Sequence, residues 1–155
     1  MILYLDTSAL VKLYAEEECT ETVERAVDEA EAVATSVVAY PEARAALARK
    51  LREDVFSPEE HQEAVEALDE DWETLDKPEV SEDLIREAGD LAEEHALRGF
   101  DAIHLAPALL LHDAYSGQET EEAVLFLGFD SNLTKAAGKV MQVYESTEDS
   151  NDQRK

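Results

Sequence analysis

The chain has 155 residues, a length typical of one domain with a single hydrophobic core. Hydrophobic residues make up 45% of it, and 38 Asp and Glu against 13 Lys and Arg give a formal net charge of -25. This charge argues against nucleic-acid binding by simple electrostatics, and the single cysteine excludes an internal disulfide and a multi-cysteine metal site.

The acidic residues lie between apolar runs such as "ILYL", "VATSVVAY" and "AVLFLGF", which indicates an acidic surface around an ordinary core. At roughly 1 M salt the Debye length is about 3 Å, so such a surface repels itself very little. We therefore expect a halophilic, archaeal source, the alternative being a mesophilic protein that is merely acidic. No apolar stretch approaches the roughly 20 residues of a membrane span, so we expect a cytoplasmic protein without membrane contact.

The first third of the chain alternates short apolar runs with amphipathic stretches, which predicts strands separated by helices. In chain order we expect a strand over 2–5, helices over 8–17 and 20–30, a strand over 32–35 and a helix to about Arg52. Thr7 or Ser8 is expected to cap the first of these helices, and Ser36 the last.

The rest of the chain continues the same pattern. Ser57, Pro58 and Glu60 form a capping-box sequence that predicts a helix to Trp72, and Ser81 is expected to cap a helix that ends near Gly99. The remaining elements are expected to be a helix over 100–112 bent at Pro107, a strand over 122–129, a helix over 131–138 and a strand over 140–144. We expect residues 1–145 to form the domain and 146–155 a flexible acidic tail.

Strands separated by helices favour the α/β class, with a mostly parallel central sheet covered on both faces in a three-layer α/β/α sandwich. Ligands of such sheets bind beyond the carboxyl ends of the strands, where the strand order reverses. Asp6 and Asp130 each follow an apolar strand, so this edge of the sheet is the expected place of a site.

Four acidic residues, Asp6, Glu42, Asp101 and Asp130, stand apart because they interrupt apolar segments. A carboxylate in such surroundings is costly to desolvate unless it is paired or binds a cation. Nearby basic residues could pair with single acids, but four acids at one sheet edge would repel one another unless a divalent cation neutralised them. Hard oxygen ligands favour Mg²⁺ or Mn²⁺, which can polarise a phosphodiester and position a water for its hydrolysis.

Four segments carry a family resemblance: "ILYLDTSALVKLY", "TSVVAYPEARAAL", "RGFDAIHLAPALLL" and "LFLGFDSNLTKAAGKV". Together, in this order from Met1 to about Tyr144, they resemble the PIN-domain ribonucleases, most closely the toxin half of VapBC-type toxin–antitoxin pairs. The resemblance implies that all four acids are catalytic. It further implies that Asp6, Asp101 and Asp130 are metal ligands and that Ser8 supports the site.

The same resemblance implies Mg²⁺-dependent cleavage of RNA, a homodimer, and inhibition by a cognate antitoxin protein. RNA affinity would then depend on high salt and on a few basic residues: Lys12, Arg44, Arg49 and Lys50. The chain departs from the family pattern at Gly128, where many relatives have Thr or Ser, and at Pro107 within the helix after Asp101.

Other functions remain open at this point. The chain could be a housekeeping PIN nuclease that processes ribosomal RNA, or a catalytically silent binding module. A phosphoryl-accepting signalling domain would need paired acids after the first strand, where this chain has "LDTS". We interpret His104 as a packed core histidine, although it lies one helical turn after Asp101, and Thr7 as a cap.

Overall fold

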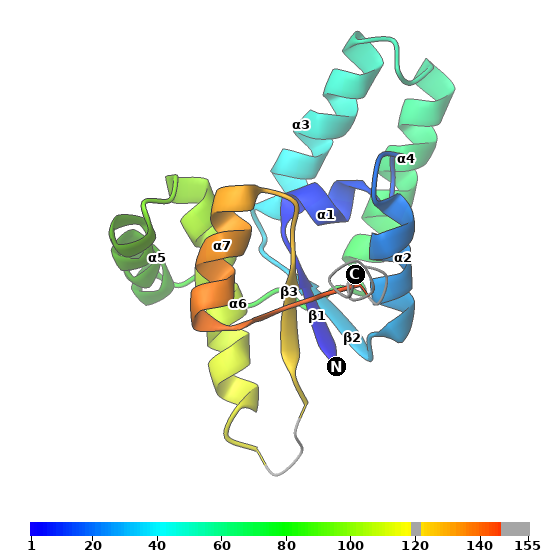
Figure 1. The fold of residues 1–155 in the computed structure, drawn as a ribbon. Coiled ribbons are helices and arrows are strands. Elements are labelled where there is room, and N and C mark those ends of the chain that lie inside the picture. The colour runs from blue at the N-terminus through cyan, green and yellow to red at the C-terminus, as the bar shows by residue number, and fades with distance from the viewer. Residues whose placement is uncertain (119–121, 147–155) are drawn as a thin grey trace, which may run out of the picture.

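The structure is a computed structural model that describes residues 1–118 and 122–146. Its four strands form one all-parallel sheet in the order β2-β1-β3-β4, with helices on both faces (Figure 1). The strands are β1 (Ile2–Leu5), β2 (Ala32–Thr35), β3 (Val124–Leu127) and β4 (Gln142–Val143). The helices are α1 (Thr7–Val11), α2 (Thr20–Glu29), α3 (Ala39–Arg52), α4 (Pro58–Trp72), α5 (Glu82–His95), α6 (Gly99–Tyr115) and α7 (Ser131–Val140). The predicted α/β fold is confirmed.

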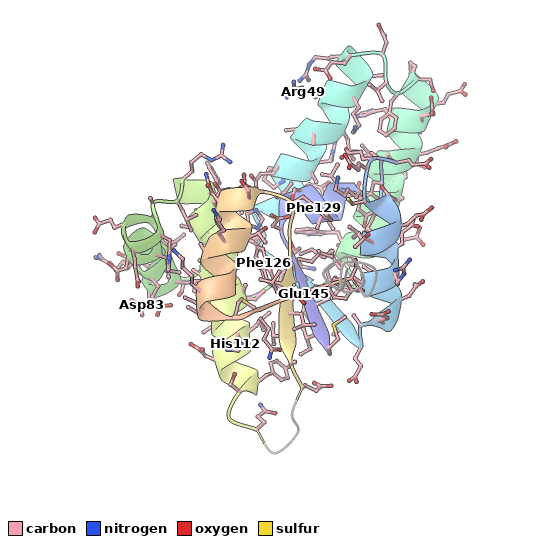
Figure 2. All side chains as sticks on the ribbon, in the orientation of Figure 1. Arg49, Asp83, His112, Phe126, Phe129 and Glu145 are labelled. Carbon is pink, nitrogen blue, oxygen red and sulfur yellow. The ribbon has the colours of Figure 1, made fainter. Side chains whose placement is uncertain are left out.

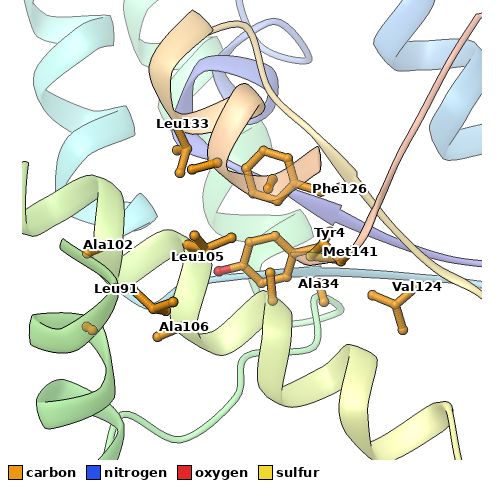
Figure 3. Packing of buried hydrophobic residues seen from close by; sticks show 14 of the residues in the cluster. Tyr4, Ala34, Leu91, Ala102, Leu105, Ala106, Val124, Phe126, Leu133 and Met141 are labelled. Atoms are coloured by element: carbon orange, nitrogen blue, oxygen red, sulfur yellow. The ribbon is translucent and has the colours of Figure 1, made fainter. Parts of the chain in front are cut away.

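Side-chain alternation along β1 divides the core into two halves. Ile2 and Tyr4 belong to the cluster that packs against α5, α6 and α7, whereas Leu3 and Leu5 belong to the cluster that packs against α1 to α4. In the first cluster the rings of Tyr4 and Phe126 stack with centroids 5.9 Å apart (Figure 3). Both sheet faces are therefore buried, and the edge at the carboxyl ends of the strands lies between the two helical layers.

The last two strands in the chain, β3 and β4, are shorter than predicted. β3 covers only 124–127 of the expected 122–129, because its parallel partner β1 has four residues, paired from Ile2 with Val124 to Leu5 with Leu127. β4 likewise contains two residues of the expected 140–144. The apolar runs thus indicated where the two strands lie, whereas pairing with the adjacent strand of the sheet set the length of each strand.

Local capping signals were correct for two helices and wrong for two others. Ser57 caps α4 in a complete capping box, and Ser81 caps α5. The N-cap of α1 is Asp6, not Thr7 or Ser8. Ser36 does not cap α3, because its hydroxyl accepts from the Val38 N–H in a turn that precedes the helix.

Four helices also begin or end differently from the prediction. α1 ends at Val11, after which backbone bonds such as Leu13 N–H to the Leu10 carbonyl have the tighter three-residue spacing. α5 ends at His95, where Ala96 adopts a left-handed conformation (φ 52°). α6 begins at Gly99 and continues through Pro107 to Tyr115, and α7 continues past Gly138 to Val140.

Within residues 1–118 and 122–146, no helix has the length and apolar character needed to cross a membrane. The predicted tail over 146–155 falls outside these residues except for Ser146, which is buried.

Candidate active site

Asp6 and Asp130 lie where the carboxyl ends of β1 and β3 meet, at the edge predicted from the sequence. Each begins the helix that follows its strand: an Asp6 oxygen accepts from the Ala9 N–H at 3.0 Å, and an Asp130 oxygen accepts from the Leu133 N–H at 3.0 Å. The chain turns directly from strand to helix at Asp6 because an N-cap carboxylate satisfies a backbone donor that would otherwise have no partner.

All four predicted acids line one pocket of about 600 Å³ at this edge. Glu42 comes from the first turn of α3 and Asp101 from the first turn of α6, and both helices begin at the same edge of the sheet (Figure 1). The predicted supporting residue Ser8 lines the same pocket. The fold therefore brings together five candidate residues from four separate segments of the chain.

Asp6 is the most buried of the four acids, with 2% of its surface exposed. Its Oδ1 accepts hydrogen bonds from the Ser8 hydroxyl at 2.6 Å and from the Ala9 N–H at 3.0 Å. Burial raises the pKa of Asp6, and these two hydrogen bonds only partly offset that effect. The Ser8 oxygen also accepts from the Phe129 N–H at 2.8 Å, so Ser8 ties Asp6 to the segment after β3.

Glu42 is held by two residues that the sequence interpretation had placed elsewhere. Its Oε1 lies 2.7 Å from His104 Nε2 and 2.8 Å from the Thr7 hydroxyl, which donates to it. Burial raises the pKa of Glu42, but the hydrogen bonds from His104 and Thr7, together with electrostatic attraction by His104 and Arg98, leave the pKa below its usual value. His104 is buried, as expected of a core histidine, yet its place one turn after Asp101 brings it to the site.

Arg98, the residue before α6, connects the other two acids. Its Nε lies 2.9 Å from Asp101 Oδ2, and its Nη2 lies 3.4 Å from Asp130 Oδ2. The hydrogen bond and the charge of Asp101, followed by the charge of Asp130, raise the pKa of Arg98. Pairing of single acids with nearby basic residues was one alternative from the sequence, and the structure shows one basic residue, Arg98, paired with two acids.

The carboxylates do not form a ready-made metal cage. Among the residues that the structure describes, no three Asp, Glu, His or Cys side chains are arranged to hold a metal ion. The contacts above give the reason, because Asp6 Oδ1 and Glu42 Oε1 are engaged in internal hydrogen bonds and Arg98 bridges Asp101 and Asp130. The predicted metal ligands are thus in one pocket, and their role stays a prediction.

Two of the four predicted basic residues, Lys12 and Arg49, line the acidic pocket. Lys12 and Lys50 both pair with Glu17, at 3.1 and 2.9 Å, so their charges are partly neutralised. Arg44 instead donates to the Tyr40 hydroxyl. Figure 2 shows Arg49 on α3 and Phe129 near the end of β3.

Comparisons with known proteins agree with this arrangement. A model of the PIN domain matches residues 3–139. Two Mycobacterium tuberculosis proteins, ribonuclease VapC45 of strain CDC 1551 / Oshkosh and ribonuclease VapC49 of strain ATCC 25618 / H37Rv, are each 38% identical to the chain over 112 residues. Each alignment covers 72% of this chain and 78% of the relative. The chain therefore belongs to the PIN-domain family.

Proposed function

We propose that this protein is a divalent-metal-dependent endoribonuclease and the toxin of a toxin–antitoxin pair. The observation that carries the proposal is the convergence of four carboxylates, from four separate elements, in one pocket of a PIN-family chain. The similarity to two proteins named VapC ribonucleases supports RNA as the substrate. Neither a signalling domain nor a ribosomal RNA processing enzyme is favoured by these comparisons.

The donor set fits Mg²⁺ or Mn²⁺. Asp6, Asp101 and Asp130 offer hard carboxylate oxygens, which these ions prefer. Arg98 already serves as a cation between Asp101 and Asp130, which is the charge arrangement that a metal ion would provide. A bound cation would polarise the phosphodiester and make a coordinated water more acidic.

Glu42 would bind and orient the attacking water, and the residues around it would hold Glu42 in place. With a pKa below its usual value, Glu42 is ionised at neutral pH. Because Thr7 and His104 fix its Oε1, its Oε2 would accept a hydrogen bond from the water and orient it toward the phosphorus. The Ser8 hydroxyl would keep the Asp6 carboxylate in one orientation during the same step.

Basic residues that line the acidic pocket would attract RNA locally, although the chain as a whole has a net charge of -25. Arg49 and Arg98 line the acidic pocket with mostly exposed side chains, 70% and 78% exposed. With a divalent cation held by the carboxylates, Arg98 would be available to pair with a phosphate oxygen of the substrate. High salt would lower the repulsion from the remaining surface.

A cleavage assay tests the proposal. A single-stranded RNA and a DNA of the same sequence are incubated with the protein in multimolar KCl, with Mg²⁺, with Mn²⁺ or with EDTA. We expect the RNA alone to be cut, and only when a divalent ion is present. Asp101→Asn, purified in parallel, controls for contaminating nucleases. RNA cleavage by both proteins in EDTA, or no cleavage in either metal, would contradict the proposal.

The toxin role and the homodimer need separate tests. Expression in a host with a KCl-rich cytoplasm should arrest growth, and Asp101→Asn should not. Co-expression of the product of an adjoining antitoxin gene should restore growth and should yield a stable complex on purification.

Light scattering should give twice the monomer mass for the purified protein, whereas a monomer mass at all concentrations would contradict the dimer.

A further inference from the structure

Lys12, the residue that ends α1, is a nearly buried cation of the acidic pocket. It is 8% exposed and lines this pocket together with Ser8, which lies one helical turn before it and holds Asp6. Its Nζ lies 4.8 Å from the centroid of the Phe129 ring, and Phe129 directly precedes Asp130. The Lys12 ammonium group is therefore held beside the segment that carries one of the four acids.

The ion pairs of Lys12 leave an excess of positive charge at this place. Lys12 Nζ lies 3.1 Å from Glu17 Oε2, and Lys50 Nζ lies 2.9 Å from Glu17 Oε1. Burial raises the pKa of Glu17, but the hydrogen bonds from Lys50 and Lys12 and the charges of both lysines leave the pKa below its usual value. Glu17 is therefore ionised at neutral pH, and two ammonium groups share one carboxylate.

The acidic pocket continues from the carboxylates toward these lysines. Glu42 and Arg49 both line it from α3, two helical turns apart, so Arg49 lies about 10 Å along the helix from Glu42. Figure 2 shows Arg49 on the part of α3 that extends away from the sheet. Lys50 follows Arg49 and is joined to Lys12 through Glu17. Lys12 and Arg49 thus lie at the same end of the pocket.

A neighbouring pocket shows on which side of Lys12 an anion fits. Lys12 and Glu17 also line this second pocket, of about 720 Å³, in which Lys12 is the only basic residue among those that the structure describes. Three further acids line it: Glu16, Glu21 and Glu24. These carboxylates would repel a phosphate, whereas the first pocket contains Arg49 and Arg98 and would hold a divalent cation. An anion at Lys12 is therefore favoured on the side of the first pocket.

Burial distinguishes Lys12 from the other basic residues of the acidic pocket. The side chains of Arg49 and Arg98 are 70% and 78% exposed, so multimolar salt strongly screens their charges. A nearly buried charge is screened much less, and a lysine ammonium is a compact charge that binds a phosphate oxygen. At the salt concentration that suits an acidic surface, Lys12 keeps most of its attraction for a phosphate.

We propose that Lys12 binds the phosphate that neighbours the scissile one in the RNA, and that Glu17 positions the Lys12 ammonium group for this contact. The inference rests on the proposed function and deepens it, because it assigns a second phosphate site in the same pocket. A purely structural ion pair between Lys12 and Glu17 is the alternative that the experiment distinguishes.

Uncharged methylphosphonate linkages test the contact. In an RNA whose cleavage site has been mapped, the two phosphates beside the scissile one are replaced singly, and kcat/KM is measured with Mn²⁺ in multimolar KCl. For the wild type, one of the two replacements should lower kcat/KM about tenfold, mainly through a higher KM. Lys12→Met keeps the apolar stem and should cut the unmodified RNA about tenfold less efficiently, and the same replacement should then cost less than about twofold.

Lys50→Met is the matched control. It removes the other lysine that pairs with Glu17, and Lys50 is not among the described residues that line the acidic pocket. Lys50→Met should therefore keep the full tenfold sensitivity to the replaced phosphate. Lys12→Gln, which can still donate to Glu17, is a second variant with the same expected loss of sensitivity as Lys12→Met. All variants are compared at a temperature where thermal unfolding shows them to be folded.

The outcomes separate this inference from the proposed function. If the wild type cuts RNA but neither replacement lowers kcat/KM, or if Lys12→Met and Lys12→Gln are as sensitive as the wild type, the ion pair is structural and the phosphate site is wrong. The same holds if Lys50→Met loses the sensitivity as fully as Lys12→Met. If the wild type cuts no RNA with any divalent ion, the proposed function is wrong and this inference falls with it.

Discussion

His104 Nε2 lies 2.7 Å from Glu42 Oε1, although the two residues are 62 positions apart in the chain. An ionised carboxylate only accepts hydrogen bonds, so the network assigns the proton to Nε2 of His104. His104 Nδ1, in contrast, is buried without a hydrogen-bond partner among the described residues. The imidazole therefore acts on the site through one nitrogen, as a fixed donor to Glu42.

Removing this donor should shift the pH dependence of cleavage. In His104→Ala, burial still raises the pKa of Glu42 while one opposing hydrogen bond is gone, so the pKa of Glu42 rises. The acid limb of the kcat/KM profile should move to higher pH, and kcat/KM at neutral pH should fall by about 10- to 100-fold. His104→Gln, which can still donate, should recover part of the loss. An unchanged pH profile in His104→Ala would contradict this role.

The same pKa shift affects stability. A carboxyl group whose pKa is lower in the folded protein stabilises it above the unfolded-state pKa, and this contribution is lost as the pH falls through the folded-state pKa. In His104→Ala the pKa of Glu42 is lowered less, so less stability depends on its ionisation. We therefore expect the acid-induced loss of Tm to be smaller in His104→Ala than in the wild type. His112→Ala, at the other end of α6, is the control and should follow the wild-type profile.

The charge of Asp6 should affect the stability of the fold in the opposite direction from the charge of Glu42. Because burial raises its pKa, ionised Asp6 destabilises the fold, and the stability present below its unfolded-state pKa is lost as the pH rises through its folded-state pKa. Asp6→Asn removes the charge and keeps an N-cap, so its Tm at neutral pH should equal or exceed that of the wild type. Asp6→Ala also loses the cap, at a cost of about 0.5–2 kcal/mol. A Tm of Asp6→Asn as low as that of Asp6→Ala would contradict this separation.

Arg98 should compete with the metal ion. Arg98→Gln removes the cation that bridges Asp101 and Asp130, so Mn²⁺ should bind a few-fold more tightly while the metal-free protein becomes slightly less stable. Arg86→Gln is a matched control, because Arg86 is 75% exposed and pairs with Glu82 on α5, away from the pocket. Isothermal titration calorimetry of both variants decides the question. Weaker Mn²⁺ binding in Arg98→Gln would show that Arg98 assists the metal and would refute competition.

The net charge of -25 predicts strong salt dependence. Screening of the acidic surface should raise the Tm steadily from dilute buffer to multimolar KCl, and RNA cleavage should need the same conditions. Sucrose at matched osmolality controls for effects that do not involve charge. An unchanged Tm and full activity in dilute buffer would contradict a halophilic origin.

The sequence predicts the features that depend on neighbouring residues. β1 and β2 have the expected bounds, and Ser57 and Ser81 cap their helices, because an apolar run or a capping residue acts within a few positions. The meeting of Asp6 and Asp130 was predictable from the rule that strand ends share one edge, whereas Glu42 and Asp101 reach this edge from the first turns of α3 and α6.

The remaining features depend on contacts between distant segments. The end of β3 is set by β1, and the role of Asp6 as N-cap depends on how sharply the chain turns after β1. The contacts of Glu42 with Thr7 and His104, and of Arg98 with Asp130, join residues at least 32 positions apart. The closeness of Lys12 to the Phe129 ring likewise appears only once β1 and β3 are paired.

The most direct test of the central claim measures Mn²⁺ binding and RNA cleavage together, for the wild type and Asp6→Asn in multimolar KCl. We expect the wild type to bind Mn²⁺ and cut the RNA. Asp6→Asn should lose both properties while its Tm is retained. If neither protein binds Mn²⁺, or if Asp6→Asn cuts RNA at the wild-type rate, the four carboxylates are not a catalytic metal site.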